Sequence, residues 1–477
     1  MIERPAALPS LPRVSLHARM QTIRHAGDSA GYKSQRNILR TAMIRYSLAV
    51  LMFALMAATA NAGGEEPRRS PAEALPPGAK IVTLEARPPR VELKTPFEYA
   101  QLLLTAHLAG GEQLDVTRLA KIEAPAKLVR VNATGVVRPV GDGKGVLTIR
   151  VQEQKLTLPV EIKGQKEQYH ASFVRDVMPT LSRMGCNAGT CHGAAKGKNG
   201  FKLSLRGYDP LFDHRSLTDD LKGRRFNRAA PDASLMLLKC TGNVAHVGGV
   251  LTQPGEPYYD LLRSWIADGV KLDLNSPRVQ SLEVLPKSSV IPLPGMKQQV
   301  AARAAYSDGS VRDVSVEAFL ESSNTEVATV DRAGTVTAVR RGETTILARY
   351  EGAYAAARIV IMGDRKGYQW RDVPAYSYID KLVDAKLKQM KILPSELCTD
   401  AEFMRRIYLD LTGLPPEPSA IRAFLADSRP GRVKREALVD KLVGSAEFIE
   451  HWTNKWADLL QVNRKFLGEK GATSFRK

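Results

Sequence analysis

Apolar and polar residues alternate over two long stretches of the chain, and a period of two is typical of half-buried β-strands. The alternation is strongest in residues 335–339 (TVTAV) and 344–348 (TTILA), and turns rich in Gly and Asp separate such runs. Short strands with frequent turns are typical of small sandwich domains. The pattern predicts two all-β units, at residues 79–165 and 280–363, each a β-sandwich of immunoglobulin type.

The two all-β units are copies of one another. Residues 84–117 align with residues 282–315 at a constant offset of 198, and after one inserted position the register resumes at an offset of 199. The matched pairs include Pro88 and Pro286, Gly111 and Gly309, Asp115 and Asp313, Gly135 and Gly334, and Gly143 and Gly342. We therefore expect both copies to have the same fold.

Residues 170–272, which we call the middle segment, carry apolar residues at helical spacing. One predicted helix starts near Phe173, and Pro179 should bend or end it. A second covers Tyr258–Ala267 and should stop at Gly269. The middle segment is therefore predicted to be all-α.

Residues 374–477 are a second helical region. Its first predicted helix has one apolar face, formed by Ile379, Leu382, Val383, Leu387 and Met390. Thr399 and Glu402 have the spacing of a capping box that opens the next helix, and Gly413 should end it. This pattern predicts a helical bundle.

The chain starts with a basic, polar leader. From Met43 it has the features of a secretory signal peptide, with an apolar core over Ser47–Ala60 and an A-x-A cleavage site at Ala60–Ala62. We expect Met43 to be the true start, residues 1–62 to be the leader and residues 63–78 a linker. The apolar core is shorter than the about 20 residues that span a bilayer. The mature chain should have no membrane span and should be periplasmic, extracellular or on the cell surface.

The 477 residues carry a formal charge of +19, and because the Lys and Arg are spread along the chain without a dense tract, a solvated basic surface is one explanation. Residues 1–62 hold eight Lys or Arg against two Asp or Glu, so their removal leaves +13. A surplus of this size favours an acidic redox partner protein or a polyanionic extracellular polysaccharide or cell-surface polymer. Aromatic residues are sparse near the basic ones, so we expect no nucleic-acid partner.

The main chemical signal of the middle segment is the stretch Cys186-Asn-Ala-Gly-Thr-Cys191-His192. In c-type cytochromes two thiols bond to the porphyrin and the histidine after the second cysteine binds iron. Four residues separate the cysteines here instead of two, and Gly189 should give the longer loop its backbone freedom. The stretch predicts covalent haem c on Cys186 and Cys191, with His192 as the proximal iron ligand.

Two other interpretations of the cysteines stay open. Cys240 and His246 could complete a zinc site with Cys186 and Cys191, because C-x4-C also occurs at such sites. The four cysteines, Cys186, Cys191, Cys240 and Cys398, could instead form disulfides in an oxidising compartment.

Haem iron held by His192 has room for a second protein ligand. We predict His246, because the glycines around it let the backbone approach a flat macrocycle. Met236 is the alternative distal ligand, although its apolar helical run favours a role in the core. His214 should lie on the surface and His170 should face solvent.

The second all-β unit resembles the bacterial Ig-like domain of group 2. The resemblance is carried by Tyr306–Ser310, Asp313–Ser315 and above all Asn324–Val339, and it is looser in the first copy. It implies spacer, adhesion or carbohydrate-adjacent scaffold modules on a secreted protein. No residue of either copy has a catalytic pattern.

The middle segment resembles the planctomycete cytochrome C domain family. The shared stretches are CNAGTCHG from Cys186, Gly200–Pro210 and Pro254–Gly269. The resemblance implies a haem-binding domain with Cys186 and Cys191 as thioether ligands and His192 as proximal ligand. It implies nothing about His246.

Residues Arg405–Pro415 resemble a domain of unknown function that recurs beside these cytochromes. Proteins of that type continue further, so we expect the helical region 374–477 to be incomplete.

These patterns predict a multidomain protein in which Ig-like sandwiches flank an all-α cytochrome c-like domain, followed by a helical bundle. The expected function is haem binding and electron transfer outside the cytoplasm, linked to oxidative processing of an extracellular polymer. Whether the chain is an enzyme stays open, because it shows no triad, phosphate loop or paired carboxylates. The alternative is a non-redox surface adhesion or scaffold protein whose cysteines hold zinc or form disulfides.

Overall fold

The computed structural model describes residues 73–220, 223–365 and 367–475. The predicted start at Met43, the cleavage site at Ala60–Ala62 and most of the expected linker lie outside these residues. Within them, no helix has both the length and the apolar character that a bilayer span requires.

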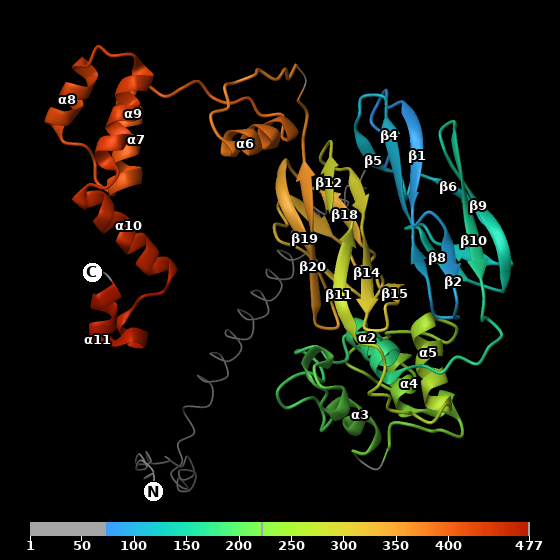
Figure 1. Ribbon diagram of the computed structural model, residues 1–477. Helices are drawn as coiled ribbons and strands as arrows, with labels where there is room; N and C mark the ends of the chain where they lie inside the picture. Colours follow the sequence, from blue (N-terminus) through green and yellow to red (C-terminus); the bar gives the residue numbers. More distant parts are fainter. Residues whose placement is uncertain (1–72, 221–222, 366, 476–477) are drawn as a thin grey trace, which may run out of the picture. The chain divides into compact units, whose positions relative to one another are not determined.

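The first all-β unit, here module 1, is a β-sandwich over residues 81–162 (Figure 1). Its strands are β1 (Ile81–Arg87), β2 (Val91–Leu93), β3 (Ala100–Gln101), β4 (Leu103–Leu108), β5 (Gln113–Asp115), β6 (Lys121–Glu123), β7 (Val129–Val131), β8 (Val136–Pro139), β9 (Gly143–Val151) and β10 (Gln154–Ile162). They form sheets of order β1-β4-β5, β2-β10-β9-β6 and β3-β8-β7. Alternate side chains of β9 and β10, such as Leu147, Ile149 and Leu158, fill the core between the sheets.

The second unit, module 2, repeats this arrangement over residues 279–361. Its strands are β11 (Val279–Leu285), β12 (Ser288–Ile291), β13 (Lys297–Gln299), β14 (Ala301–Tyr306), β15 (Val311–Asp313), β16 (Phe319–Ser322), β17 (Ala328–Val330), β18 (Thr335–Ala338), β19 (Gly342–Tyr350) and β20 (Ala353–Ile361). Its sheets have the orders β11-β14-β15, β12-β20-β19-β16 and β13-β18-β17, which match module 1 strand for strand. The predicted sandwich fold is confirmed for both copies.

The one-residue insertion between the copies lies in a loop. Strands β4 and β14 are offset by 198 positions and strands β9 and β19 by 199. The change occurs between β6 and β7 in module 1, and between β16 and β17 in module 2. A loop accepts an extra residue without shifting the alternation of buried and exposed strand positions.

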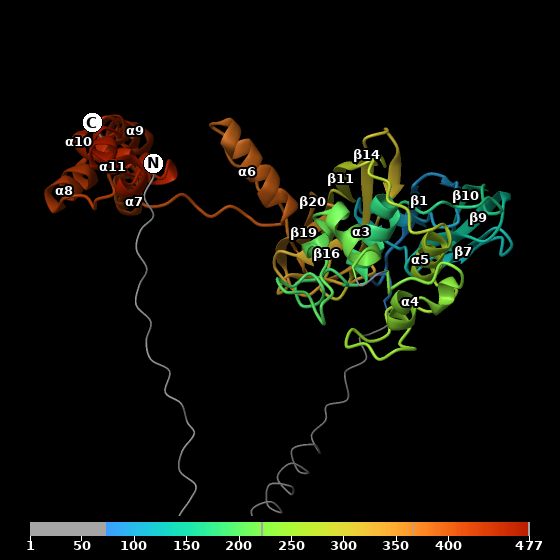
Figure 2. The ribbon, with the colours of Figure 1, turned by 90° about the horizontal axis from the view of Figure 1, so that it is seen from below.

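The middle segment is helical with long loops (Figure 2). Its elements are the π-helix η1 (Phe173–Val177), α2 (Met178–Arg183), the short 3-10 turns η2 (Leu205–Gly207) and η3 (Pro231–Ala233), α3 (Pro210–Thr218), α4 (Leu235–Cys240) and α5 (Pro257–Ala267). Protein side chains fill its core, in which Trp265 is fully buried and stacks on Phe173 at 5.2 Å.

Pro179 does not end the first helix of the middle segment. The chain forms the π-turn η1 and then continues as α2, with Pro179 in the first turn of α2. A proline is tolerated there because its missing N–H has no acceptor in the first helical turn.

The C-terminal region is entirely helical in the described residues, as predicted. Its helices are α6 (Tyr378–Gln389), α7 (Asp400–Thr412), α8 (Pro418–Ala426), α9 (Gly431–Leu442), α10 (Ala446–Leu459) and α11 (Arg464–Phe475). The predicted capping box of Thr399 and Glu402 opens α7, and Gly413 ends it in the left-handed conformation. Met404, Phe424, Leu438 and Leu442 form the core of this bundle.

Helix α6 is present as predicted, but its apolar face is exposed in the structure. Ile379, Leu382 and Val383 retain 54%, 66% and 49% of their accessible surface.

Candidate functional site

The predicted haem-attachment stretch forms a closed loop directly after α2. The N–H of His192 donates to the carbonyl of Cys186 at 3.0 Å, and the N–H of Cys191 donates to that of Ala188 at 2.9 Å. These bonds bring the two ends of the stretch together although four residues separate the cysteines. The loop geometry therefore accommodates the longer spacing.

The glycine that supplies backbone freedom is not the predicted one. Gly189 does not adopt a positive φ, whereas Gly185, just before the stretch, has φ 80°. Gly193, just after the stretch, is required for another reason: a Cβ there would lie 2.1 Å from the carbonyl oxygen of Asn187. Neither position lies between the cysteines, so the spacing of the stretch does not indicate them.

Asn187 is the polar anchor of the loop. It is 3% exposed, and its side-chain N–H donates to the Ser182 hydroxyl of α2 at 2.8 Å. Its carbonyl accepts the N–H of Arg206 at 3.0 Å. The loop is thereby fixed both to the preceding helix α2 and to the 3-10 turn η2 that follows it.

His192 has a defined orientation. Its Nδ1 lies 3.1 Å from the carbonyl oxygen of Phe201, so Nδ1–H donates and the Nε2 lone pair stays free. Burial lowers the pKa of His192, and the nearby side chains of His246, Arg225 and Lys198 add to this effect. A neutral imidazole with a free Nε2 is the form that binds a metal ion.

The predicted distal ligand His246 lies near enough to His192 to contribute to the lowering of its pKa. Its Nδ1 is buried and has no hydrogen-bond partner among the described residues. Gly248 packs against its ring, since a Cβ at that position would lie 2.7 Å from Cε1. The glycine-rich loop thus positions an imidazole that lacks a hydrogen bond.

The other candidate ligands have structural roles. Met236 is half-buried and packs against the core of the middle segment. The prediction of a surface position for His214 is wrong: its Nε2 donates to the Val270 carbonyl at 2.7 Å, and its ring packs edge-on against Phe173 at 5.1 Å. His170 is 61% exposed as predicted, and pairs with Asp268 at 3.0 Å.

The thiols of Cys186 and Cys240 lie in contact, although all four cysteines of the chain are free. The interaction with the Cys240 thiol, together with burial, raises the pKa of the Cys186 thiol, and the same interaction lowers the pKa of Cys240. In the described residues, no three His, Cys, Asp or Glu side chains converge into a group that could hold a metal ion. The four-residue zinc set is therefore not assembled.

A second candidate site is a cavity of about 1050 Å³ lined by both modules and the middle segment. Its wall includes Glu317 of module 2, which accepts hydrogen bonds from Tyr99 of module 1 and, at 3.4 Å, from Tyr258 of α5. Asp176 of η1 pairs with Arg312 of module 2 at 3.0 Å. The wall of the cavity thus carries both acidic and basic side chains.

Two family models match parts of the chain. Residues 278–349 match the bacterial Ig-like domain (group 2). Module 2 is therefore similar to that family over these residues. Residues 378–474 match the family described as a protein of unknown function (DUF1549), which covers helices α6–α11. The resemblance of the middle segment to the planctomycete cytochrome C domain stays a prediction.

No curated protein matches the chain. Among solved structures, the S-layer protein SbsC, domains 5–6, is similar at 9% identity and a TM-score of 0.22, covering 60% of this chain and 100% of that one. The surface layer protein SbsC, domains 1–6, gives 12% identity and a TM-score of 0.17, covering 61% of this chain and 30% of that one. Human protocadherin-24 EC1-2 gives 9% identity and a TM-score of 0.13, covering 60% and 100%. TM-scores this low support no conclusion about the function of this chain.

Proposed function

We propose that this chain is an exported cell-surface protein in which the two Ig-like modules hold the middle segment as part of one scaffold. The observation that carries this proposal is the meeting of three parts of the chain at Glu317. Tyr99 of module 1 and Tyr258 of the middle segment both donate to this carboxylate of module 2. Partly buried bonds of this kind help to fix the relative positions of the parts they join.

The experiment is expression of the complete chain with a C-terminal tag in a bacterium with two membranes. The expected result is a periplasmic or surface-exposed product whose intact mass corresponds to cleavage after Ala62. A product that keeps its leader and stays in the cytoplasm would overturn the proposal.

A second candidate function is one-electron transfer by covalent haem c on the middle segment. It is supported by the free Nε2 of His192 and by the unpaired, buried Nδ1 of the neighbouring His246. Cys186 and Cys191 would hold the porphyrin and His192 the iron, with His246 as distal ligand. Bound haem would supply a redox centre of tunable potential. An acidic redox protein suits the basic mature chain, and an extracellular polymer is the substrate class that the surface location favours.

A disulfide is the alternative to haem attachment at Cys186. Because the thiols of Cys186 and Cys240 are in contact, these two residues could form a disulfide, losing two protons and two electrons to a disulfide-donating oxidase of the same compartment. A disulfide there would remove Cys186 from haem attachment.

One preparation separates the two outcomes. The exported chain is produced with haem-attachment machinery, and its pyridine haemochrome spectrum and denatured intact mass are recorded. A c-type band with one retained haem, lost in Cys186→Ala/Cys191→Ala but kept in Cys240→Ala, supports the haem proposal. A colourless chain with a mapped Cys186–Cys240 peptide overturns it and leaves the scaffold proposal intact.

A further inference from the structure

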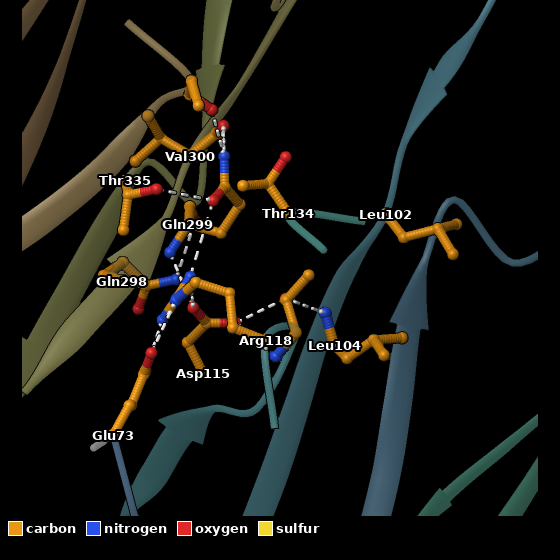
Figure 3. A network of polar contacts seen from close by, with 12 residues as sticks. Glu73, Leu102, Leu104, Asp115, Arg118, Thr134, Gln298, Gln299, Val300 and Thr335 are labelled. Carbon is orange, nitrogen blue, oxygen red and sulfur yellow. Dashed lines mark hydrogen bonds and ion pairs between the residues drawn. The ribbon is translucent and has the colours of Figure 1, made fainter. Parts of the chain in front are cut away.

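Modules 1 and 2 contact each other through two equivalent hydrogen bonds, in which the two modules exchange the roles of donor and acceptor. The N–H of Gln101 in module 1 donates to Oδ2 of Asp313 in module 2 at 2.6 Å. The N–H of Gln299 in module 2 donates to Oδ2 of Asp115 in module 1, also at 2.6 Å. Figure 3 shows the second of these contacts.

The four residues are two equivalent pairs. Gln299 is the counterpart of Gln101, and Asp313 is the counterpart of Asp115, both at the offset of 198. The glutamine of each module therefore contacts the aspartate of the other module. This exchange is the defining property of an isologous interface, which relates two identical subunits by a two-fold axis.

The donor and the acceptor are built in the same way in both modules. The second oxygen of each aspartate accepts the N–H of a hydroxyl residue two positions later, at 3.0 Å for both Thr117 and Ser315. That hydroxyl in turn accepts a strand N–H, from Leu104 at 2.9 Å and from Ala302 at 2.8 Å. These bonds lie within one module, so each aspartate is oriented before docking.

The glutamine side chains are equally well positioned. Nε2 of Gln101 donates to the carbonyl of Thr134 at 2.5 Å, and Nε2 of Gln299 donates to that of Ala333 at 2.6 Å. Gln101 is 2% exposed and Gln299 is fully buried, so water does not replace the contact. Because these bonds within each module orient the donor and the acceptor beforehand, they reduce the ordering cost of association.

We propose that the two modules are equivalent to a homodimer fused into one chain. Each module has a self-complementary face that docks a second copy of the same module. This face carries Gln101 and Asp115 in module 1 and Gln299 and Asp313 in module 2. In the intact chain the partner is internal. When the internal partner cannot dock, module 2 pairs with module 2 of another chain.

The internal partner has two advantages. It is tethered, so its effective concentration exceeds that of a free copy. It also gains contacts that only one side of the pseudo-symmetric interface has. Arg118, which pairs with Asp115 of its own module at 2.8 Å, donates to Oε1 of Gln299 in module 2 at 3.4 Å, whereas its counterpart in module 2 is Val316.

The test uses the complete mature chain and two variants. Asp115→Arg removes the acceptor of module 1 and places a cation beside Arg118, which leaves Gln299 and Asp313 of module 2 intact. Asp115→Arg/Asp313→Arg removes both acceptors. Sedimentation velocity at concentrations up to about 100 µM, within reach of a weak dimer, compares both with the wild-type chain. Hydrogen exchange in β9–β10 and β19–β20 verifies that both modules stay folded.

The expected result is a gain of dimer in Asp115→Arg that disappears in the double variant. If Asp115→Arg keeps the oligomeric state of the wild type while its modules are folded and undocked, the proposal is wrong. If Asp115→Arg unfolds, Asp115→Asn replaces it. Hydrogen exchange at Gln101 and Gln299 should then accelerate together by about tenfold or more, and acceleration at Gln299 alone overturns the proposal. Asp308→Ala, an exposed turn aspartate bonded only to Ser310, is the matched control.

Discussion

Gln152 and Glu351 occupy the same position in the two modules, the first residue of the two-residue turn that joins the last two strands. Both have a positive φ, 52° for Gln152 and 45° for Glu351. Their environments differ: Gln152 is exposed, whereas Glu351 is half-buried near Arg278 and Arg349. One copy therefore carries an ionisable group where the other has a neutral amide.

Burial raises the pKa of Glu351 from 4.5 to about 7. Because the folded state holds the proton more tightly than the unfolded state, the associated stability is complete below pH 4.5 and is lost as the pH rises to about 7. A shift of this size corresponds to about 3 kcal/mol. We expect Glu351→Gln to remove this loss, so that the variant is more stable than the wild type at pH 8 and equal to it near pH 4.

Urea denaturation between pH 4 and 8 measures this difference. The control is Glu153→Gln, an exposed glutamate in the corresponding turn of module 1, which should leave the pH profile unchanged. If the stability of Glu351→Gln and of the wild type changed with pH in the same way, the raised pKa of Glu351 would be contradicted.

Gly193→Ala should destabilise the Cys186–His192 loop. Its Cβ would lie 2.1 Å from the Asn187 oxygen, so backbone must move, at a cost of about 1–3 kcal/mol. Gly189→Ala is the matched control, since its Cβ would meet only Leu205 Cδ1 at 3.6 Å. Thermal unfolding followed by Trp265 fluorescence should show a lower midpoint for Gly193→Ala alone, and equal losses for both would refute the steric explanation.

Glu317→Ala should loosen the junction of the three parts. It leaves the hydroxyls of Tyr99 and Tyr258 without their acceptor, and because this site is only partly buried the loss costs up to about 3 kcal/mol. Limited proteolysis should cut the middle segment faster in this variant. Glu326→Ala, which removes a 74% exposed side chain from a surface pair with Arg340, should behave like the wild type. Equal cleavage rates in Glu317→Ala and the wild type would show that the junction does not hold the parts.

His246→Ala tests the distal ligand that the haem proposal assigns. In the haem-loaded chain, the variant should change the ferric visible spectrum from a low-spin to a high-spin form, because a coordination position opens. His170→Ala is the control, because that side chain is 61% exposed and pairs with Asp268. A spectrum of His246→Ala identical to that of the wild type would show that His246 is not the distal ligand, and Met236 would then be substituted in the same test.

The strands could be predicted because their burial follows from period-two alternation, and the duplication supplied a second, independent alignment of the same elements. The capping box at Thr399 and the glycine stop at Gly413 were predictable for a similar reason, since both act on neighbouring backbone groups. Such local rules need no knowledge of tertiary contacts.

Contacts between distant residues were not predictable from these rules. His214 was placed on the surface because charged residues flank it, yet its partner is the carbonyl of Val270, 56 positions away. The proximity of Cys186 to Cys240 and the constraint on Gly193 also depend on how loops fold over one another. The Gln–Asp contacts between modules join residues more than 180 positions apart, which no local pattern indicates.

The docking of module 1 onto module 2 has a consequence for the chain between them. The middle segment leaves module 1 after Ile162 and enters module 2 at Val279, so the two docked modules hold its ends at a fixed separation. When the segment unfolds while the modules stay docked, it becomes a closed loop with fewer conformations than a free chain of the same length. Docking therefore acts as a reversible cross-link that disfavours the unfolded middle segment through chain entropy, as a disulfide across its base would.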